Sequence, residues 1–341
     1  MFRELIEKLQ QQRDLTVDEA AGAMEAIMDG RAQPAQIAGF LVALAMKGER
    51  PDEIVGLART MRARATTLSR SFAPVFDTCG TGGDGANTFN VSTVAALVLA
   101  ACGVRVAKHG NRSASSRCGS ADLLEALGVN VSASPAAVER CLDRAGIAFL
   151  FAPVFHPSMK HAGPTRKELG IRTAFNLLGP LTNPAGASRQ LVGVPRPELT
   201  ELVARSLAQL GAERAWVVHG ADGLDEISTT GYTKVSECRD GRVNTFYLHP
   251  GDVGIPKSAP EALKGGDAAD NAAIARSVLT GTPGAARDVV LLNTAAALLI
   301  AGRAASVKEG LPMAADAIDS GRAAAVLQQL VEHSREGAAV S

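Results

Sequence analysis

The hydrophobic pattern changes near residue 75, and this change constrains the fold more than any other feature of the sequence. Before it, apolar residues recur at helical spacing, as at Phe2, Leu5, Ile6 and Leu9, and no alternating β-branched run is present. After it, short apolar runs alternate with polar loops and helical segments. This alternation is typical of a largely parallel sheet covered by helices. The sequence therefore predicts an α/β protein with a small all-helical part followed by a larger part around a mostly parallel central sheet.

Local signals place the ends of the first helices. Residues 16–19, Thr-Val-Asp-Glu, form a capping box, in which the threonine hydroxyl and the glutamate carboxylate satisfy each other's backbone N–H groups. Gly30 and Gly48 are helix stops, and Pro34 and Pro51 suit the first turn of the helices that follow. We expect four helices before the pattern changes.

Five strands and a hairpin are expected in the larger part. We predict the strands over residues 75–77, 104–108, 147–151, 190–194 and 215–218, and the hairpin over 235–248 with Asp240-Gly241 as its turn. Helical segments are expected over 94–101 and 120–127. Ligands in parallel sheets bind at the carboxyl ends of the strands, so the loops after these runs are the candidate sites.

A glycine-rich loop follows the first predicted strand. Gly80, Gly82 and Gly85 satisfy G-x-G-x-x-G, but the next helix begins only near Ser92 and no acidic residue ends the second strand, which argues against a dinucleotide site. A Walker loop is excluded because residues 86–87 are Ala-Asn instead of Lys and Ser or Thr. The loop can still wrap an anion with its N–H groups, although a simple tight turn is an open alternative.

Two further segments suit a phosphorylated ligand. Residues 90–93, Asn-Val-Ser-Thr, open a helix, where backbone donors favour phosphate, although ordinary helix capping is an equal alternative. Lys108 and Arg112 stand among serines and a glycine after the second predicted strand. This combination indicates a phosphate cradle, against the alternative of a solvated loop.

An acidic loop follows the strand predicted over residues 215–218. Asp225 and Glu226 are adjacent, and hard carboxylate oxygens suit Mg²⁺ bound together with a phosphorylated ligand. A merely solvated pair is the alternative. No H-E-x-x-H motif or Cys/His cluster occurs, which argues against zinc.

Charge and cysteine usage exclude several classes. Lys plus Arg and Asp plus Glu both count 35, so the chain lacks the basic excess of a general nucleic-acid binder. The five cysteines contain no C-x-x-C pair, which indicates a reducing compartment. We see no signal peptide and no apolar segment long enough for a bilayer, and we expect a cytoplasmic protein without a membrane partner. The length, 341 residues, fits about two domains.

Taken together, the motifs carry a family resemblance. The chain resembles the anthranilate phosphoribosyltransferase family at residues 80–84 (GTGGD), 90–93 (NVST), 108–113 (KHGNRS), 179–184 (GPLTNP) and 222–226 (DGLDE). The matches run in order over nearly the whole chain. The resemblance implies a nucleoside phosphorylase/phosphoribosyltransferase-like fold, with residues 1–70 and 164–184 in a helical domain and 71–163 and 185–341 in an α/β domain. It also implies a homodimer through the helical domain.

The resemblance further implies the reaction and its residues. The phosphoribosyl group of phosphoribosyl pyrophosphate would pass to the amine of anthranilate, with Mg²⁺ as cofactor, in tryptophan biosynthesis. We expect the phosphoribosyl pyrophosphate site to include Gly80, Gly83, Asp84, Thr88, Asn90, Val91, Ser92, Thr93, Lys108, His109, Gly110, Asn111, Arg112, Ser113, Ala114, Ser115, Ser116 and Ser120. We expect the anthranilate site to include Gly80, His109, Asn111, His156, Arg166 and Pro180. We expect the metal ligands to be Ser92, Asp225 and Glu226.

No catalytic base is expected, because an aromatic amine is already neutral near neutral pH. Lys108, Asp84 and Asn111 are instead expected to position the substrate and its leaving group. Two alternatives stay open: a nucleoside phosphorylase of the same fold, and a non-catalytic relative that binds nucleic acid. A nucleoside phosphorylase would carry a second glycine-rich phosphate loop, which this sequence lacks. A nucleic-acid-binding relative would be expected to lose Asp225 and Glu226 and to gain basic residues.

Overall fold

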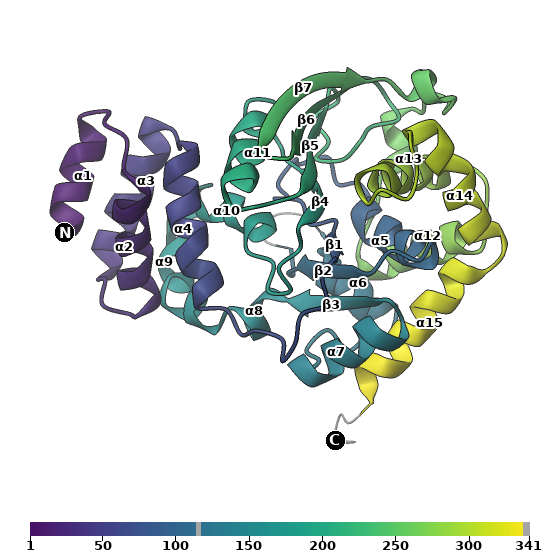
Figure 1. Cartoon of the computed structure of the whole chain (residues 1–341), viewed down its shortest axis with the longest axis horizontal. Helices are drawn as coiled ribbons and strands as arrows, with labels where there is room; N and C mark the ends of the chain where they lie inside the picture. The colour runs from purple at the N-terminus through teal and green to yellow at the C-terminus, as the bar shows by residue number, and fades with distance from the viewer. Residues whose placement is uncertain (114–116, 337–341) are drawn as a thin grey trace.

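The molecule has a helical part at one end and a sheet covered by helices at the other (Figure 1). The computed structural model describes residues 1–113 and 117–336. The first four helices are α1 Phe2–Gln10, α2 Val17–Met28, α3 Pro34–Lys47 and α4 Pro51–Ala63. The capping box predicted at residues 16–19 is confirmed: the Thr16 hydroxyl accepts from Glu19 N at 3.2 Å, and the Glu19 carboxylate accepts from Thr16 N at 2.7 Å.

A segment far along the chain packs against these helices. It contains α8 Ala152–Phe155, α9 Gly163–Leu169 and α10 Phe175–Leu178, with 3₁₀ turns at Pro157–His161 and Gly179–Leu181. Helix α9 contacts α3, and α10 contacts α4. Phe175 and Leu178 share an apolar core with Phe40 and Ile54 of the N-terminal helices. We call residues 152–181 the insertion.

The described residues contain one seven-stranded sheet with the order β3-β2-β1-β4-β5-β6-β7. Its strands are β1 Phe76–Asp77, β2 Val106–Gly110, β3 Ile147–Phe151, β4 Arg189–Gly193, β5 Arg214–Gly220, β6 Thr233–Arg239 and β7 Arg242–Leu248. Strands β1 to β5 pair in parallel, and β6 and β7 are antiparallel. The predicted turn is confirmed, because Asp240 and Gly241 both have positive φ, as a two-residue hairpin turn requires. The predicted fold class is therefore confirmed.

Strand β2 is shifted further from its predicted position than the other strands. Strand β2 begins and ends two residues later than the predicted 104–108, so Lys108 and His109 lie inside the strand. The reason is pairing with the neighbouring strand: β2 matches β3 residue by residue from Val106 opposite Ile147 to Gly110 opposite Phe151. In this register Lys108 lies opposite Phe149 of β3.

Helices cover both faces of the sheet. The helices of this part are α5 Val91–Ala101, α6 Ser120–Ala126, α7 Pro135–Arg144, α11 Leu199–Gln209, α12 Ala268–Leu279, α13 Ala285–Ile300, α14 Val307–Asp319 and α15 Arg322–Arg335. Helix α11 packs on β5 and β6 and against α4, so it joins the sheet to the helical part. Helix α5 is buried on almost every side, between the sheet and helices α13 and α15.

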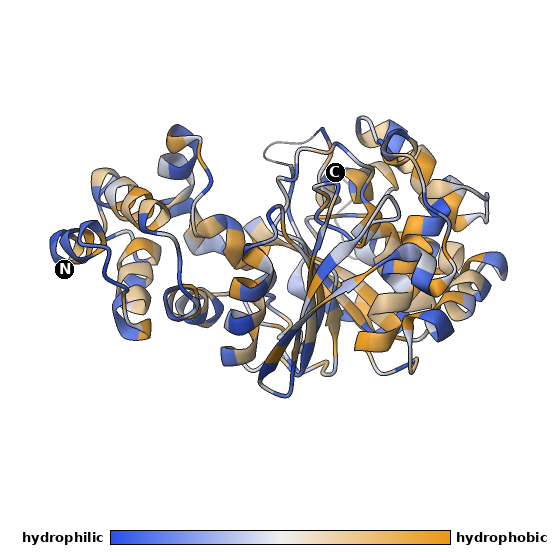
Figure 2. Cartoon of the chain, turned by 90° about the horizontal axis from the view of Figure 1, so that it is seen from above, coloured by the Kyte–Doolittle hydropathy of each residue, from blue (hydrophilic) through white to orange (hydrophobic). Residues whose placement is uncertain are grey.

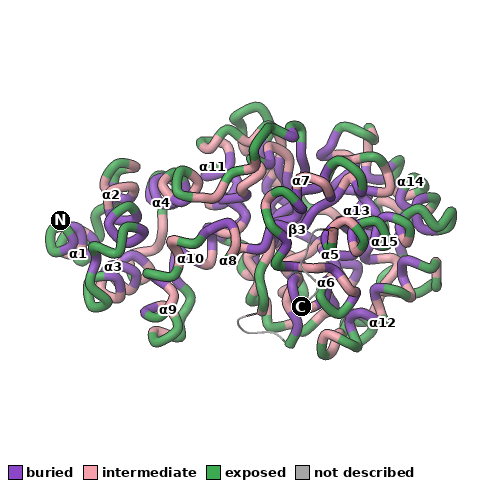
Figure 3. The backbone as a smooth tube through the Cα atoms, turned by 90° about the horizontal axis from the view of Figure 1, so that it is seen from below, coloured by how far each residue is buried: buried purple, intermediate pink, exposed green. Residues whose placement is uncertain are grey.

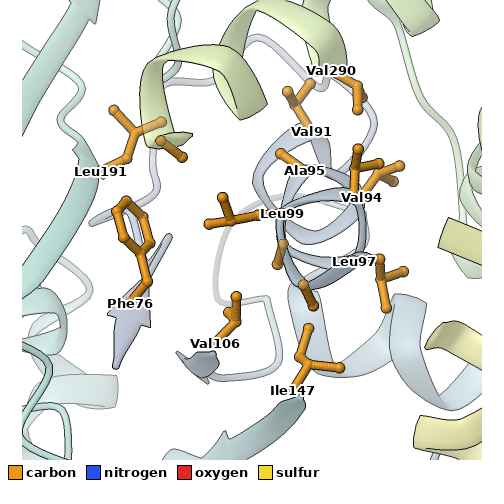
Figure 4. Packing of buried hydrophobic residues seen from close by; sticks show 14 of the residues in the cluster. Phe76, Val91, Val94, Ala95, Leu97, Leu99, Val106, Ile147, Leu191 and Val290 are labelled. Atoms are coloured by element: carbon orange, nitrogen blue, oxygen red, sulfur yellow. The ribbon is translucent and has the colours of Figure 1, made fainter. Parts of the chain in front are cut away.

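The main apolar core lies around α5. Figure 4 shows Leu99 of α5 between Phe76, Val106 and Leu191 of three strands, with Val290 of α13 on the far side of the helix. Hydrophobic residues line the inward sides of the helices, and hydrophilic residues lie on their outer turns (Figure 2). Buried backbone gathers around β3, α5 and α13 (Figure 3). In the part of the chain that the structure describes, no helix combines the length and the apolar character needed to cross a membrane.

Candidate active site

A cleft with a volume of about 950 Å³ opens between the carboxyl ends of the central strands and the insertion. Its wall on the sheet side consists of the loops after β1, β2 and β5, and its other wall consists of insertion residues. Pockets of this size hold substrates of small-molecule enzymes. The three loops that the sequence singled out therefore meet in one cavity.

The glycine-rich loop presents unused backbone donors to the cleft. Gly82, Gly83 and Gly85 have φ values of +67°, +82° and +72°, which favour glycine. Among the described residues, the N–H groups of Gly83, Asp84 and Gly85 have no hydrogen-bond partner. Thr81 N anchors the loop by donating to Gly193 O at 2.9 Å. A loop held in this way, with free N–H groups, suits an anionic ligand.

The loop after β2 adds polar groups from the neighbouring strand. Lys108 is buried, and its ammonium donates to Thr78 O at 3.2 Å and to Thr78 Oγ1 at 3.1 Å. Because an ammonium has three donors, a third remains for a ligand in the cleft, which Lys108 lines. Asn111 and Ser120 also line the cleft and are joined by a bond from Ser120 Oγ to Asn111 O at 3.3 Å.

Arg112 is engaged in a way that the sequence did not indicate. Its guanidinium pairs with Asp122 at 2.9 Å and with Glu125 at 2.8 Å, both on α6. The residue lines the cleft, but this charge is already balanced by two carboxylates. The spacing of 10 and 13 residues exceeds one helical turn, so the pairing depends on how α6 packs. Three further expected residues, Ala114, Ser115 and Ser116, lie outside the described residues.

A buried carboxylate below the cleft links two of these segments. Asp77, at the end of β1, accepts from His109 N at 3.1 Å with one oxygen and from Asn183 Nδ2 at 2.7 Å with the other. Burial raises the pKa of Asp77 to about 6, although Lys108 and the hydrogen bonds oppose the shift. Sequence reasoning missed Asp77, and an acidic residue at the end of a buried strand was the available signal.

Acidic residues meet beside the glycine-rich loop. Glu226 Oε1 accepts from Ser92 N at 3.0 Å, and Asp225 lies so close to the loop that a Cβ atom at Gly80 would be 3.2 Å from its Oδ2. Asp84 Oδ2 is buried and has no partner among the described residues. Burial, followed by the charge of Asp84, raises the pKa of Asp225, and burial, followed by the charge of Asp225, raises that of Glu226.

These oxygens fit Mg²⁺, the ion expected from the sequence. The donors are carboxylate oxygens, one of them without a hydrogen bond, and they repel one another in the absence of a cation. In residues 1–113 and 117–336, no group of three or more His, Cys, Asp or Glu side chains is placed so that it could hold a metal ion by itself. This arrangement suits Mg²⁺, which keeps waters and usually arrives with substrate phosphates.

Two histidine rings, His109 of β2 and His156 of the insertion, meet across the cleft, and the insertion wall also carries an arginine. His109 and His156 have ring centroids 5.1 Å apart, and His109 Nδ1 is 3.0 Å from Gly179 O. Burial, followed by the charge of His156, lowers the pKa of His109 to about 3, and burial lowers that of His156 to about 4, so both rings are neutral at neutral pH. Arg166 lies 4.8 Å from the Phe175 ring centroid, and no carboxylate among the described residues pairs with it.

Most of the remaining expected residues line the cleft, and two do not. Thr88, Asn90 and Thr93 are in its lining. Val91 is buried in the apolar core, where Figure 4 shows it facing α13. Pro180 is also buried outside the lining, and its carbonyl accepts from Gln190 Nε2 at 2.7 Å. The contacts expected for Val91 and Pro180 therefore stay predictions.

Both parts of the chain match known glycosyl transferase domains. Residues 3–65 match the helical bundle domain of the glycosyl transferase family, and residues 73–324 match its a/b domain. The anthranilate phosphoribosyltransferase of Moorella thermoacetica is 59% identical over 97% of this chain and 98% of that protein. That of Acetivibrio thermocellus is 53% identical over 97% of this chain and 96% of that protein.

Solved structures agree with the sequence relatives. The anthranilate phosphoribosyltransferase of Thermus thermophilus superposes with a TM-score of 0.91 at 47% identity, over 97% of this chain and 99% of that chain. The enzyme of Saccharomyces cerevisiae in complex with phosphoribosyl pyrophosphate and Mg superposes with a TM-score of 0.88 at 28% identity, over 98% of this chain and 97% of that chain. These findings support neither alternative left open by the sequence. The chain belongs to the anthranilate phosphoribosyltransferase family.

Proposed function

We propose that this protein transfers the phosphoribosyl group of phosphoribosyl pyrophosphate to the amino group of anthranilate. The products are N-(5-phosphoribosyl)anthranilate and pyrophosphate, in a step of tryptophan biosynthesis. The observation that carries the proposal is the division of one cleft. Unused backbone donors and Lys108 lie on one wall with the acidic pair, and an unpaired arginine beside an aromatic ring lies on the other.

The sheet-side wall is proposed to bind phosphoribosyl pyrophosphate. The free N–H groups of Gly83 to Gly85 and the third donor of Lys108 can donate to phosphate oxygens without breaking an existing hydrogen bond. Asn111 and Ser120 extend the same surface. Asp77 supports it by holding the backbone of His109, next to Lys108. We expect phosphoribosyl pyrophosphate held by these groups to present its anomeric carbon toward the insertion.

The acidic pair is proposed to hold Mg²⁺ with the substrate. Asp225 and Glu226 provide the carboxylates, and Ser92 is close enough to act with Glu226, to which its N–H donates. Mg²⁺ bound there would neutralise charge that develops on the pyrophosphate leaving group. Gly193 supports the acidic loop, since a Cβ atom at this position would overlap the carbonyl oxygen of Asp225.

The insertion wall is proposed to bind anthranilate. Arg166 can pair with its carboxylate, and the neighbouring neutral rings of His109 and His156 suit an aromatic ligand. Positioning both substrates in one cleft is a large part of the catalysis, because fixed orientation can lower a barrier by roughly 7–11 kcal/mol. The aromatic amine is neutral, so the protein needs to orient it and not to deprotonate it.

Anthranilate fluorescence provides the test. Purified protein with phosphoribosyl pyrophosphate and Mg²⁺ is expected to remove the fluorescence, and a chelator of Mg²⁺ is expected to stop the loss. Unchanged fluorescence under saturating conditions would refute the proposal. Phosphate-dependent cleavage of a nucleoside in a parallel assay would instead support the phosphorylase alternative.

We also propose the assembly, the domain division and the location. A homodimer through the N-terminal helices is supported by Met1 and Met46, apolar residues of this part that are 53% and 80% exposed. A helical domain of residues 1–70 and 164–184 is supported by the contacts of α9 with α3 and of α10 with α4. Sedimentation velocity tests the dimer, and a Met46→Glu variant is expected to shift it toward the monomer. Cell fractionation tests the cytoplasmic location.

A further inference from the structure

Arg172 crosses from the insertion to the glycine-rich loop. It lies between α9 and α10, and its Nη2 donates to Gly82 O at 3.0 Å. A Cβ atom at Gly83 would overlap Nη1 of the same guanidinium, so the arginine packs directly against the loop. Arg172 lines the cleft. The contacts proposed for the two substrates do not include this residue.

The charge of Arg172 is not balanced by an ion pair. Among the described residues, no carboxylate lies within 4.0 Å of its guanidinium, whereas nearby Arg196 pairs with Glu198 at 3.3 Å. Burial, followed by the charge of Arg196, lowers the pKa of Arg172, and the charges of Asp225 and Asp84 oppose this shift. The group stays charged, because an arginine in a protein does not lose its proton at neutral pH.

The free donors around Arg172 define what could bind there. One of its five N–H groups is used by Gly82, and the adjacent N–H groups of Gly83, Asp84 and Gly85 have no partner among the described residues. A planar guanidinium beside several backbone donors matches a group with many anionic oxygens, such as a pyrophosphate, better than it matches a single carboxylate.

We propose that Arg172 is a further substrate-binding residue, which contacts the pyrophosphate group of phosphoribosyl pyrophosphate and of the released product. This inference rests on the proposed function and assigns a residue to its leaving group. Because α9 and α10 pack on α3 and α4, Arg172 links the helical part to the glycine-rich loop. Binding of the leaving group therefore joins the two walls of the cleft.

Product inhibition by pyrophosphate tests the assignment at saturating Mg²⁺. Arg172→Gln is expected to raise the inhibition constant of pyrophosphate and the KM of phosphoribosyl pyrophosphate by about 10- to 100-fold, as for loss of a bond to a charged group. The KM of anthranilate should change by less than about twofold. Arg172→Lys keeps the charge without the planar fork, and we expect it to raise the inhibition constant about fivefold. Arg196 is a neighbouring residue outside the cleft lining, so the Arg196→Gln variant should have the wild-type inhibition constant for pyrophosphate.

Several outcomes would overturn the proposal. Unchanged pyrophosphate inhibition in Arg172→Gln would mean that the residue only shapes the loop, and equal changes in both KM values would mean the same. If circular dichroism shows that the Arg172→Gln variant does not fold, the Arg172→Lys variant provides the test. A wild-type inhibition constant for pyrophosphate in that variant would refute the assignment. An inactive wild type would refute the proposed function instead, and calorimetric titration with pyrophosphate and Mg²⁺ would then still test Arg172.

Discussion

Replacing Arg166 tests how the cleft distinguishes its two substrates. The guanidinium lies 4.8 Å from the Phe175 ring centroid, lines the cleft and has no carboxylate partner among the described residues. Arg166→Gln removes the charge and keeps a polar side chain of intermediate length. The ring contact contributes only about 0.5–1 kcal/mol, so the variant is expected to fold.

The magnitude follows from the bond that is lost. A hydrogen bond to a charged group contributes about 1.5–3 kcal/mol, and an arginine can make two with one carboxylate. Arg166 is half-buried, and solvent screening reduces the sum, so we expect a loss of about 2–3 kcal/mol in anthranilate binding. This free energy corresponds to a rise of about 30- to 150-fold in the KM of anthranilate.

The assay is the initial rate of anthranilate fluorescence loss, with each substrate varied in turn. The KM of phosphoribosyl pyrophosphate is expected to stay within about threefold of the wild type, since Arg166 belongs to the insertion wall. Lys167→Gln is the matched control, because Lys167 is the next residue of α9, is exposed and lies outside the cleft lining. Equal increases in both KM values, or an unchanged KM for anthranilate, would refute the assignment of Arg166.

Three further predictions concern the loops and the carboxylate below them. The double variant Asp225→Asn/Glu226→Gln should lower turnover strongly and raise the Mg²⁺ concentration required for activity. Its melting temperature without metal should rise, because burial and charge repulsion, which raise the pKa values of both carboxyls, destabilise the charged forms in the wild type. Superimposable Mg²⁺ titrations would contradict this metal site. The carboxyl of Asp77 has a pKa of about 6, above its unfolded value, so its stabilising contribution is present at low pH and is lost as the pH rises through 6. Relative to Asp77→Asn, the wild type should gain about 1 kcal/mol in free energy of unfolding between pH 7 and pH 5 by urea titration, and parallel pH profiles would argue against the shift. Gly193→Ala should displace the Asp225 carbonyl and weaken Mg²⁺-dependent activity at unchanged secondary structure, which activity and circular dichroism together would check.

Features that depend on neighbours along the chain could be predicted from the sequence. The Thr16 cap, the proline starts of α3 and α4 and the Asp240-Gly241 turn are short-range signals, and the structure confirms each. The glycine-rich loop, Lys108 and the acidic pair were also predictable as a group, because parallel strands bring the loops at their carboxyl ends to one edge of the sheet.

Features that depend on residues far apart in the chain required the tertiary structure. Asp77 meets Asn183 across 106 residues, and Arg172 meets Gly82 across 90, so no local pattern could indicate either bond. The same limit explains Arg112, whose partners are set by the packing of α6. Periodicity shows which residues face a core, whereas the order of the strands and the docking of the insertion decide which polar groups share the cleft. The strand order and the docking of the insertion are stabilised by the burial of two apolar cores, and the composition of the cleft is therefore a property of the whole chain.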